Sequence, residues 1–146
     1  MVGQRTSDEA AIRRRLDTLV SAVRAADLEG LKSIYAPDIV SFDLEPPLQH
    51  VGAEAKRKNW LHAFSMYQRP LGYEIRDLTI TVGDEVAFGH GLIRVSGTMT
   101  NGNRTEGWLR STTCFRKING TWLIAHDQVS APLDLGSGRA LLNLAP

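Results

Sequence analysis

Side chains that can exchange protons and form hydrogen bonds gather in one strand-like segment near the end of the chain. In Thr121–Ser130, alternate residues share one face of a pleated strand. That face carries, in order, Trp122, Ile124, His126, Gln128 and Ser130. It begins apolar and becomes polar. Because unpaired polar groups are costly to bury, the imidazole, amide and hydroxyl predict the wall of a cavity.

Two other predicted strands supply a carboxylate, a second imidazole and a guanidinium. The β-branched and aromatic segment Ile39–Leu44 places Asp43 near its end. In Val86–Thr98, His90 and Arg94 share a face that also changes from apolar to polar. We expect these side chains to face the same cavity as the last strand.

A carboxylate and two imidazoles facing one cavity could move a proton, since a base in an apolar cleft can be tuned toward neutral pH. The hypothesis is that Asp43 acts as the base and His126 or His90 as the acid, while Arg94 orients an anionic or carbonyl group. A structural role remains open for each. Asp43 could pair with Arg94 or cap a loop, and His126 could hydrogen-bond Thr113. Arg94 could form an ion pair at its strand end.

The dipeptide Asn119-Gly120 predicts a two-residue turn, which would determine the residues that face each other across the last hairpin. Without a bulge, the facing pairs on the cavity side are Phe115–Ile124, Thr113–His126, Ser111–Gln128 and Leu109–Ser130. The reverse side would then carry Trp108, Arg110, Thr112 and Cys114 against Val129 and Asp127, with Arg110 near Asp127. A bulge would shift this register by one residue.

This register predicts a binding site around the acid–base residues. Its members share the cavity face or the cavity wall, and they are Arg94, Trp60, Phe88, Ser111, Thr113, Gln128 and Ser130. The neutral hydrogen-bonding groups near Arg94 favour a hydrophobic or carboxylate-bearing small molecule as the ligand.

Helical patterns come first in the chain and strand patterns follow. A capping box at Thr6 and Glu9 predicts a first helix to about Ala26, and Asp27 predicts the cap of a short second helix through Tyr35. A third helix follows Gly52, with Trp60, Leu61 and Phe64 as its apolar stripe and Lys56, Arg57 and Lys58 mainly solvated. Four strands are then expected at Tyr73–Val82, Val86–Thr98, Thr105–Lys117 and Thr121–Ser130. The order predicts an α+β domain, a cone-shaped barrel in which a curved, mainly antiparallel sheet wraps around three N-terminal helices.

Composition narrows the class of partner. The chain has 146 residues, 42% of them hydrophobic, which predicts a single domain over 1–146 with its core at about 8–132 and a C-terminal tail at 133–146. A net charge of +1 gives no global field to hold nucleic acid or an anionic membrane surface. The lone Cys114, and the lack of a signal peptide or a membrane-spanning apolar run, predict a cytoplasmic location.

No metal or other cofactor is expected. The four histidines, His50, His62, His90 and His126, have no spacing that binds a metal locally, although Asp43, His90 and His126 could converge. Cys114 is expected on the face opposite His126 as an inert thiol.

The chain resembles the nuclear transport factor 2-like superfamily and, within it, the SnoaL-like and ketosteroid-isomerase-like domains, over about residues 8–132. The segments that carry the resemblance are the N-terminal amphipathic helix, Ala26-Asp27-Leu28-Glu29-Gly30, Tyr35-Ala36-Pro37-Asp38 leading to Phe42-Asp43, Gly52-Ala53-Glu54-Ala55, and Arg110-Ser111-Thr112 through Trp122, Ile124, His126 and Ser130. The ending is also similar to the association domain of calcium/calmodulin-dependent protein kinase II.

The resemblance implies a cone with a deep internal pocket and often a dimer through the outer sheet face. It implies that Asp43 matches the proton-shuttling base of ketosteroid isomerases. The tyrosine and the acid that polarise the carbonyl in those enzymes match about Leu19 and Thr113, and the strand acid of SnoaL-type cyclases matches Gln128. Epoxide hydrolases of this group use an Asp-Arg-Asp set, of which Asp43 and Arg94 are counterparts.

Two kinds of function follow. The first is a cofactor-free isomerase, cyclase or dehydratase that moves a proton on a hydrophobic carbonyl compound. The second is a non-catalytic ligand-binding or association module. Trp108 and Val129 on the reverse face favour a homodimer in either case, because a partner often covers a large aromatic side chain on an outer sheet face.

Overall fold

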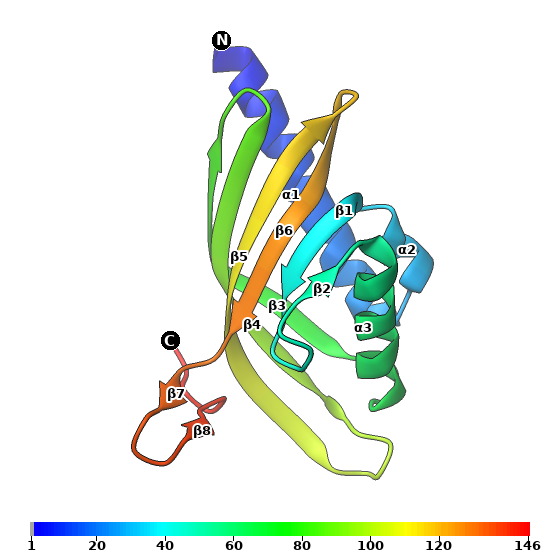
Figure 1. The fold of residues 1–146 in the computed structure, drawn as a ribbon, viewed down its shortest axis with the longest axis vertical. Helices are drawn as coiled ribbons and strands as arrows, with labels where there is room; N and C mark the ends of the chain where they lie inside the picture. Colours follow the sequence, from blue (N-terminus) through cyan, green and yellow to red (C-terminus); the bar gives the residue numbers. More distant parts are fainter. Residues whose placement is uncertain (1) are drawn as a thin grey trace.

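The computed structural model describes residues 2–146, in which helices lie on one side of a strongly curved sheet (Figure 1). The helices are α1 (Val2–Ala25), α2 (Leu28–Lys32) and α3 (Ala53–Ser65). The strands are β1 (Tyr35–Phe42), β2 (His50–Val51), β3 (Gly72–Val82), β4 (Val86–Thr98), β5 (Arg104–Ile118), β6 (Thr121–Ser130), β7 (Leu133–Asp134) and β8 (Arg139–Ala140).

The main sheet has six strands in the order β2-β1-β6-β5-β4-β3. Every neighbouring pair is antiparallel except β1 and β6, which run parallel. The predicted α+β architecture with a curved, mainly antiparallel sheet is confirmed. The sheet stays open, since β2 and β3 are its two edges.

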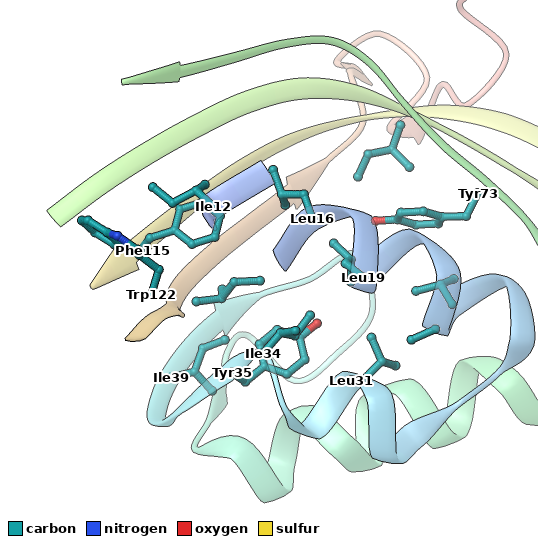
Figure 2. Close-up of a cluster of buried hydrophobic side chains, with 14 of the residues drawn as sticks. Ile12, Leu16, Leu19, Leu31, Ile34, Tyr35, Ile39, Tyr73, Phe115 and Trp122 are labelled. Atoms are coloured by element: carbon teal, nitrogen blue, oxygen red, sulfur yellow. The ribbon is translucent and has the colours of Figure 1, made fainter. Parts of the chain in front are cut away.

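Helix α1 packs against β3 and β6, and α3 packs against β1 and β2. The main core lies between α1 and the sheet, where Ile12 and Leu16 meet Phe115 and Trp122 from the β5–β6 hairpin (Figure 2). The Trp122 indole donates a hydrogen bond to the buried Asp8 carboxylate on α1, at 3.0 Å. The residues with helical spacing in the first segment therefore form the apolar face of α1, as predicted.

The first two helices differ from their predicted bounds. Helix α1 starts at Val2, so Thr6 lies inside it and does not cap it. Asp27 does cap α2, since its Oδ1 accepts the Gly30 N–H at 3.0 Å. The second helix ends at Lys32, and Tyr35 already belongs to β1, because parallel pairing with β6 extends the strand toward its start. No helix within residues 2–146 is long and apolar enough to cross a membrane.

The β5–β6 hairpin turns as expected but carries a bulge. Asn119 and Gly120 both have positive φ, 49° and 79°, as a type I′ turn requires. The pair Phe115–Ile124 is confirmed, and the next pair is then Cys114–His126, which leaves Ala125 without a partner in β5. One extra residue in a strand reverses which face every later side chain occupies.

The pairs predicted beyond this bulge are wrong. The observed pairs are Thr113–Asp127, Thr112–Gln128, Ser111–Val129 and Arg110–Ser130. Asp127 and Val129 therefore face the helices, while His126, Gln128 and Ser130 face away from them.

Candidate functional site

A buried lysine forms the centre of the site. Lys56 on α3 is 1% exposed, although its position beside Arg57 and Lys58 predicted a solvated side chain. Its Nζ lies 3.1 Å from Asp43 Oδ2 and 3.3 Å from Asp127 Oδ2, and it donates to Ser41 Oγ at 3.0 Å. We call these four residues the Lys56 cluster.

The fold brings the Lys56 cluster together from three elements. Ser41 and Asp127 are partners in the parallel pairing of β1 with β6, so their side chains lie side by side, and Ser41 donates to Asp127 Oδ1. Asp43 follows the last residue of β1, and its Oδ1 accepts the Leu44 N–H at 2.7 Å. Helix α3 packs on β1 and thereby delivers the ammonium between the two carboxylates.

The two carboxylates of the cluster stabilise the charged form of Lys56. Burial disfavours the ammonium and is the largest single influence on it, but Asp127 and Asp43 together outweigh burial and raise the pKa of Lys56. The side chain is therefore an ammonium at neutral pH. Two carboxylates around one ammonium give the cluster a formal charge of −1.

Aromatic side chains lie next to the cluster. Lys56 Nζ is 5.4 Å from the centroid of the Trp60 ring and 5.9 Å from that of Tyr35, within reach of a cation–π interaction. The Trp60 indole donates to the Tyr35 hydroxyl at 2.8 Å, and its ring lies edge-on to Tyr73 with centroids 6.5 Å apart. Burial raises the pKa of both Tyr35 and Tyr73, so both phenols stay protonated.

A cavity of about 270 Å³ opens beside these groups. The charged part of its wall consists of Asp43, Glu45, Lys56, Glu106 and Asp127. Most of the remaining wall is apolar or aromatic and includes Leu19, Val23, Tyr35, Trp60, Ala63, Met66, Tyr67, Leu71, Tyr73, Ile93, Val95, Leu109, Val129 and Leu142. Such a cavity can enclose an apolar molecule and present it to a few polar groups.

The structure brings only some of the predicted site residues to this cavity. Asp43 and Trp60 line it, and Thr113 is buried on the inner side of β5. The pairing of Asp43 is with Lys56 and not with Arg94. Arg94 instead forms an ion pair with Glu106 at 2.6 Å, with both side chains well exposed.

The predicted residues Phe88, His90, His126, Gln128 and Ser130 lie on the far side of the sheet, which we call the outer face and define by Phe88, His90, Thr112, His126 and Gln128. Ser111 pairs with Val129 and belongs to the inward row of β5. In β4 the inward positions belong to small or aliphatic residues such as Ala87, and the alternate residues point outward. In β6 the bulge turns the histidine, the amide and the hydroxyl outward. The prediction that His90, His126 and Asp43 face one cavity is therefore wrong in its geometry.

On the outer face, His126 Nδ1 donates a hydrogen bond to the Val40 carbonyl oxygen, with 2.6 Å between the heavy atoms, and the imidazole meets the Phe42 ring edge-on at 4.7 Å. A carbonyl oxygen only accepts, so His126 Nδ1 carries the proton in this bond. The predicted bond to Thr113 is absent from the part of the chain that the structure describes, since the two side chains lie on opposite faces.

A shallow outer groove of about 620 Å³ collects other predicted residues. It is lined by Asp77, Thr79, His90, Gly91, Leu92, Arg110, Ser111, Thr112, Gln128 and Ser130. Arg110 donates to Ser130 at 3.1 Å and is not the neighbour of Asp127 that the unbulged register predicted.

Two further side-chain placements differ from the prediction. Cys114 pairs with His126 across the strands and shares its face, and partial burial raises the pKa of the thiol. Val129 lines the cavity and does not accompany Trp108 on the outer face. Among residues 2–146, no three His, Cys, Asp or Glu side chains are grouped so that they could hold a metal ion.

Three residues of the Lys56 cluster were missed in the sequence, namely Ser41, Lys56 and Asp127. Lys56, Trp60 and Phe64 follow one another at intervals of four residues, so the lysine lies on the apolar stripe of α3, and this signal was available. Asp127 had no such signal, because its inward direction depends on the bulge at Ala125.

Comparison with known proteins identifies the class. Residues 12–134 match the model of the SnoaL-like domain family, and the chain belongs to this family within the nuclear transport factor 2-like superfamily. A comparison with curated protein sequences gave no match.

Three solved structures illustrate the range of similar folds. An NTF2-like protein of unknown function from Pseudomonas putida KT2440 is 32% identical, with 97% of this chain and 98% of that chain covered and a TM-score of 0.88. A ketosteroid isomerase-like protein from Erwinia carotovora atroseptica SCRI1043 is 22% identical, with coverages of 83% and 93% and a TM-score of 0.71. The association domain of the C. elegans calcium/calmodulin-dependent protein kinase II is 16% identical, with coverages of 88% and 98% and a TM-score of 0.68. The last two likenesses concern the fold alone.

Proposed function

We propose that this protein is an enzyme that moves a proton on a neutral, hydrophobic carbonyl compound, with Asp43 as the base. The observation that carries the proposal is the position of Asp43, which is on the wall of a mostly apolar cavity and beside a buried ammonium. Of the two carboxylates of the Lys56 cluster, the Asp43 side chain is the more exposed, 22% against 11% for Asp127. It is therefore the one better placed to meet a ligand.

In this reaction Asp43 takes a proton from the carbon next to the carbonyl group, and the electron pair of that C–H bond moves into an enolate. Where a C=C bond is conjugated to the enolate, return of the proton from Asp43 to the far carbon of that system completes an isomerisation. Where the neighbouring carbon carries a hydroxyl group, that group instead takes the proton from Asp43 and leaves as water, which completes a dehydration. Both outcomes need only an acid–base group and a site that stabilises the enolate oxygen.

Tyr73 is the group that we propose to face that oxygen. Its side chain is 8% exposed, lines the cavity and extends from β3 toward α1 (Figure 2). Its hydroxyl makes no hydrogen bond to any other group of residues 2–146. A phenol hydroxyl that lines the cavity and is not engaged by another side chain can donate a hydrogen bond to an oxygen of the ligand.

The charges of the cavity favour a neutral ligand. The Lys56 cluster is formally negative, so it repels a carboxylate, and Arg94 is held by Glu106. The carboxylate-bearing ligand considered from the sequence loses its guanidinium partner in this arrangement. Histidines 90 and 126, on the outer face, have no part in the proposed proton transfer.

The test uses 2-tetralone, a neutral bicyclic ketone with acidic protons beside its carbonyl group. Exchange of these protons for deuterium in D₂O is followed by NMR with the wild type and with Asp43→Asn, which preserves the shape of the side chain. The wild type is expected to accelerate exchange, and Asp43→Asn to slow the catalysed rate by at least about 100-fold. Arg94→Gln serves as the control and should exchange at the wild-type rate. Equal catalysed rates for the wild type and Asp43→Asn would refute the role of Asp43.

A second proposed property is homodimer formation through the outer face. The supporting observation is a group of exposed apolar side chains there, which are Phe42, Val86 and Phe88. Light scattering should give twice the monomer mass for the wild type and the monomer mass for Phe88→Asp. Leu48→Asp is the control, because Leu48 is 96% exposed in the loop before β2. A dimer without any Asp43-dependent exchange would favour the association module over the enzyme.

A further inference from the structure

The C-terminal segment covers part of β5 beyond the end of β6. The last pair between these strands is Arg110–Ser130, so Arg104–Leu109 continues without a partner from β6. There the Trp108 N–H donates to the Leu142 carbonyl at 2.8 Å. The Leu141 N–H donates to the Pro132 carbonyl, also at 2.8 Å, and closes the β7–β8 hairpin back onto the chain. The end of the chain thus lies beside β5 near the point where β6 has ended (Figure 1).

Gly107 permits this close approach. A Cβ atom at position 107 would lie 3.1 Å from the Leu142 carbonyl oxygen and 3.2 Å from Leu142 Cβ. These separations are tighter than ordinary van der Waals contacts, so a side chain at position 107 would push the segment away. In the neighbouring strand β4, the residue that pairs with Gly107 is Val95, which also lines the cavity.

The Leu142 side chain is partly exposed to solvent and partly part of the cavity wall. It is 44% exposed to solvent, and it lines the cavity together with Gly107 and Val129. Val129 is two residues beyond Asp127 on the same face of β6, which places it about 7 Å further along the strand. The segment therefore continues the cavity wall at a point where β6 has ended.

We propose that Leu142 determines ligand specificity by limiting the length of the apolar molecule that the cavity accepts. This inference rests on the proposed function in that it assumes a hydrophobic carbonyl compound in the cavity. Two backbone hydrogen bonds, from Trp108 to Leu142 and from Leu141 to Pro132, hold this segment, and none of its residues belongs to the Lys56 cluster. A small change at this position should therefore alter the cavity without disturbing the Lys56 cluster.

The experiment measures the affinity of 2-heptanone, 2-nonanone and 2-undecanone from the rise in melting temperature with ketone concentration. Replacing Leu142 with alanine removes three carbons from the wall. Since each buried methylene is worth about a fourfold change in affinity, Leu142→Ala should raise the affinity ratio of the longest to the shortest ketone about tenfold or more. The matched control is Leu135→Ala on the β7–β8 turn, where the leucine is 87% exposed and does not belong to the wall of this cavity. It should leave the ratio unchanged.

A second variant tests the segment without removing any apolar group. Gly107→Ala should displace Leu142, raise the same ratio, and speed hydrogen exchange at the Trp108 amide by at least about tenfold. Unchanged ketone ratios in both Leu142→Ala and Gly107→Ala would overturn the inference, and so would an equal change in Leu135→Ala.

The outcomes separate this inference from the proposed function. Asp43-dependent exchange on 2-tetralone with an unchanged ketone ratio in Leu142→Ala would overturn the role of Leu142 alone. A changed ratio without Asp43-dependent exchange would support Leu142 and contradict the proton transfer. If none of the three 2-alkanones raises the melting temperature of the wild type, the role of Leu142 is overturned, and the exchange of 2-tetralone decides the proton transfer separately.

Discussion

Lys56 Nζ lies 3.3 Å from Asp127 Oδ2, and this pair joins helix α3 to the last long strand of the sheet. Both side chains are almost fully enclosed, and Ser41 bonds to both of them. The pair thereby connects the helical layer to the sheet at the wall of the cavity. A buried charge is tolerated only where its partners are present, so the cluster should act as one structural unit.

Replacing Lys56 with methionine should destabilise the fold by about 3–5 kcal/mol, because Asp127 and Asp43 would lose the only cation between them in the described chain. Denaturant unfolding measures the difference. The matched control is Arg57→Met, which breaks an exposed ion pair with Glu54 and should cost far less stability, because solvent screens that pair. Similar losses in the two variants would mean that the buried cluster adds no more to stability than a surface pair.

Stability at alkaline pH should depend on the same lysine. Its pKa is raised above the ordinary 10.5 in the folded protein, so the folded state holds this proton more tightly than the unfolded state. Its contribution is fully present below pH 10.5 and is lost as the pH rises through the folded pKa. Melting temperature measured across this range should fall more steeply in the wild type than in Lys56→Met. Parallel curves would contradict the raised pKa.

Stability at acid pH should depend on Asp8. The hydrogen bond from Trp122, assisted by Lys117 and Gln4, lowers the pKa of Asp8 below its ordinary 3.8. A lowered folded pKa gives stability that is present above pH 3.8 and is lost as the pH falls through the folded value. When melting temperature is measured at a series of falling pH values, Asp8→Asn should therefore show a smaller decrease than the wild type. Asp84→Asn is the control, because Asp84 is exposed, and its melting temperature should fall with pH as steeply as that of the wild type.

Tyr73→Phe tests the group proposed to face the ligand oxygen. Removing only the hydroxyl should lower the catalysed exchange of 2-tetralone by about 100-fold or more and weaken its binding by about fivefold. It should also raise the infrared stretching frequency of the bound carbonyl group. Tyr67→Phe is the control, because Tyr67 lines the same cavity but its hydroxyl accepts a bond from Thr105 at 3.3 Å. An unshifted carbonyl band in Tyr73→Phe would rule out the contact.

Local sequence determined the elements of this protein. The apolar spacing of α1 and the Asn119-Gly120 turn act over a few residues, so both were correctly predicted and both are found. The family also followed from short segments, and Asp43 was expected on a cavity wall, where the structure places it.

Tertiary structure decided which side chains share that cavity with Asp43. One unpaired residue, Ala125, reverses the faces of β6, so Asp127 points inward and His126 outward. The alternation of residues along a strand shows which side chains share a face, but only pairing with neighbouring strands shows whether that face is inside. Lys56 is buried for a related reason, since its solvation depends on two carboxylates that reach it from other elements. Long-range pairing, which local spacing does not encode, therefore determined the chemistry of the site.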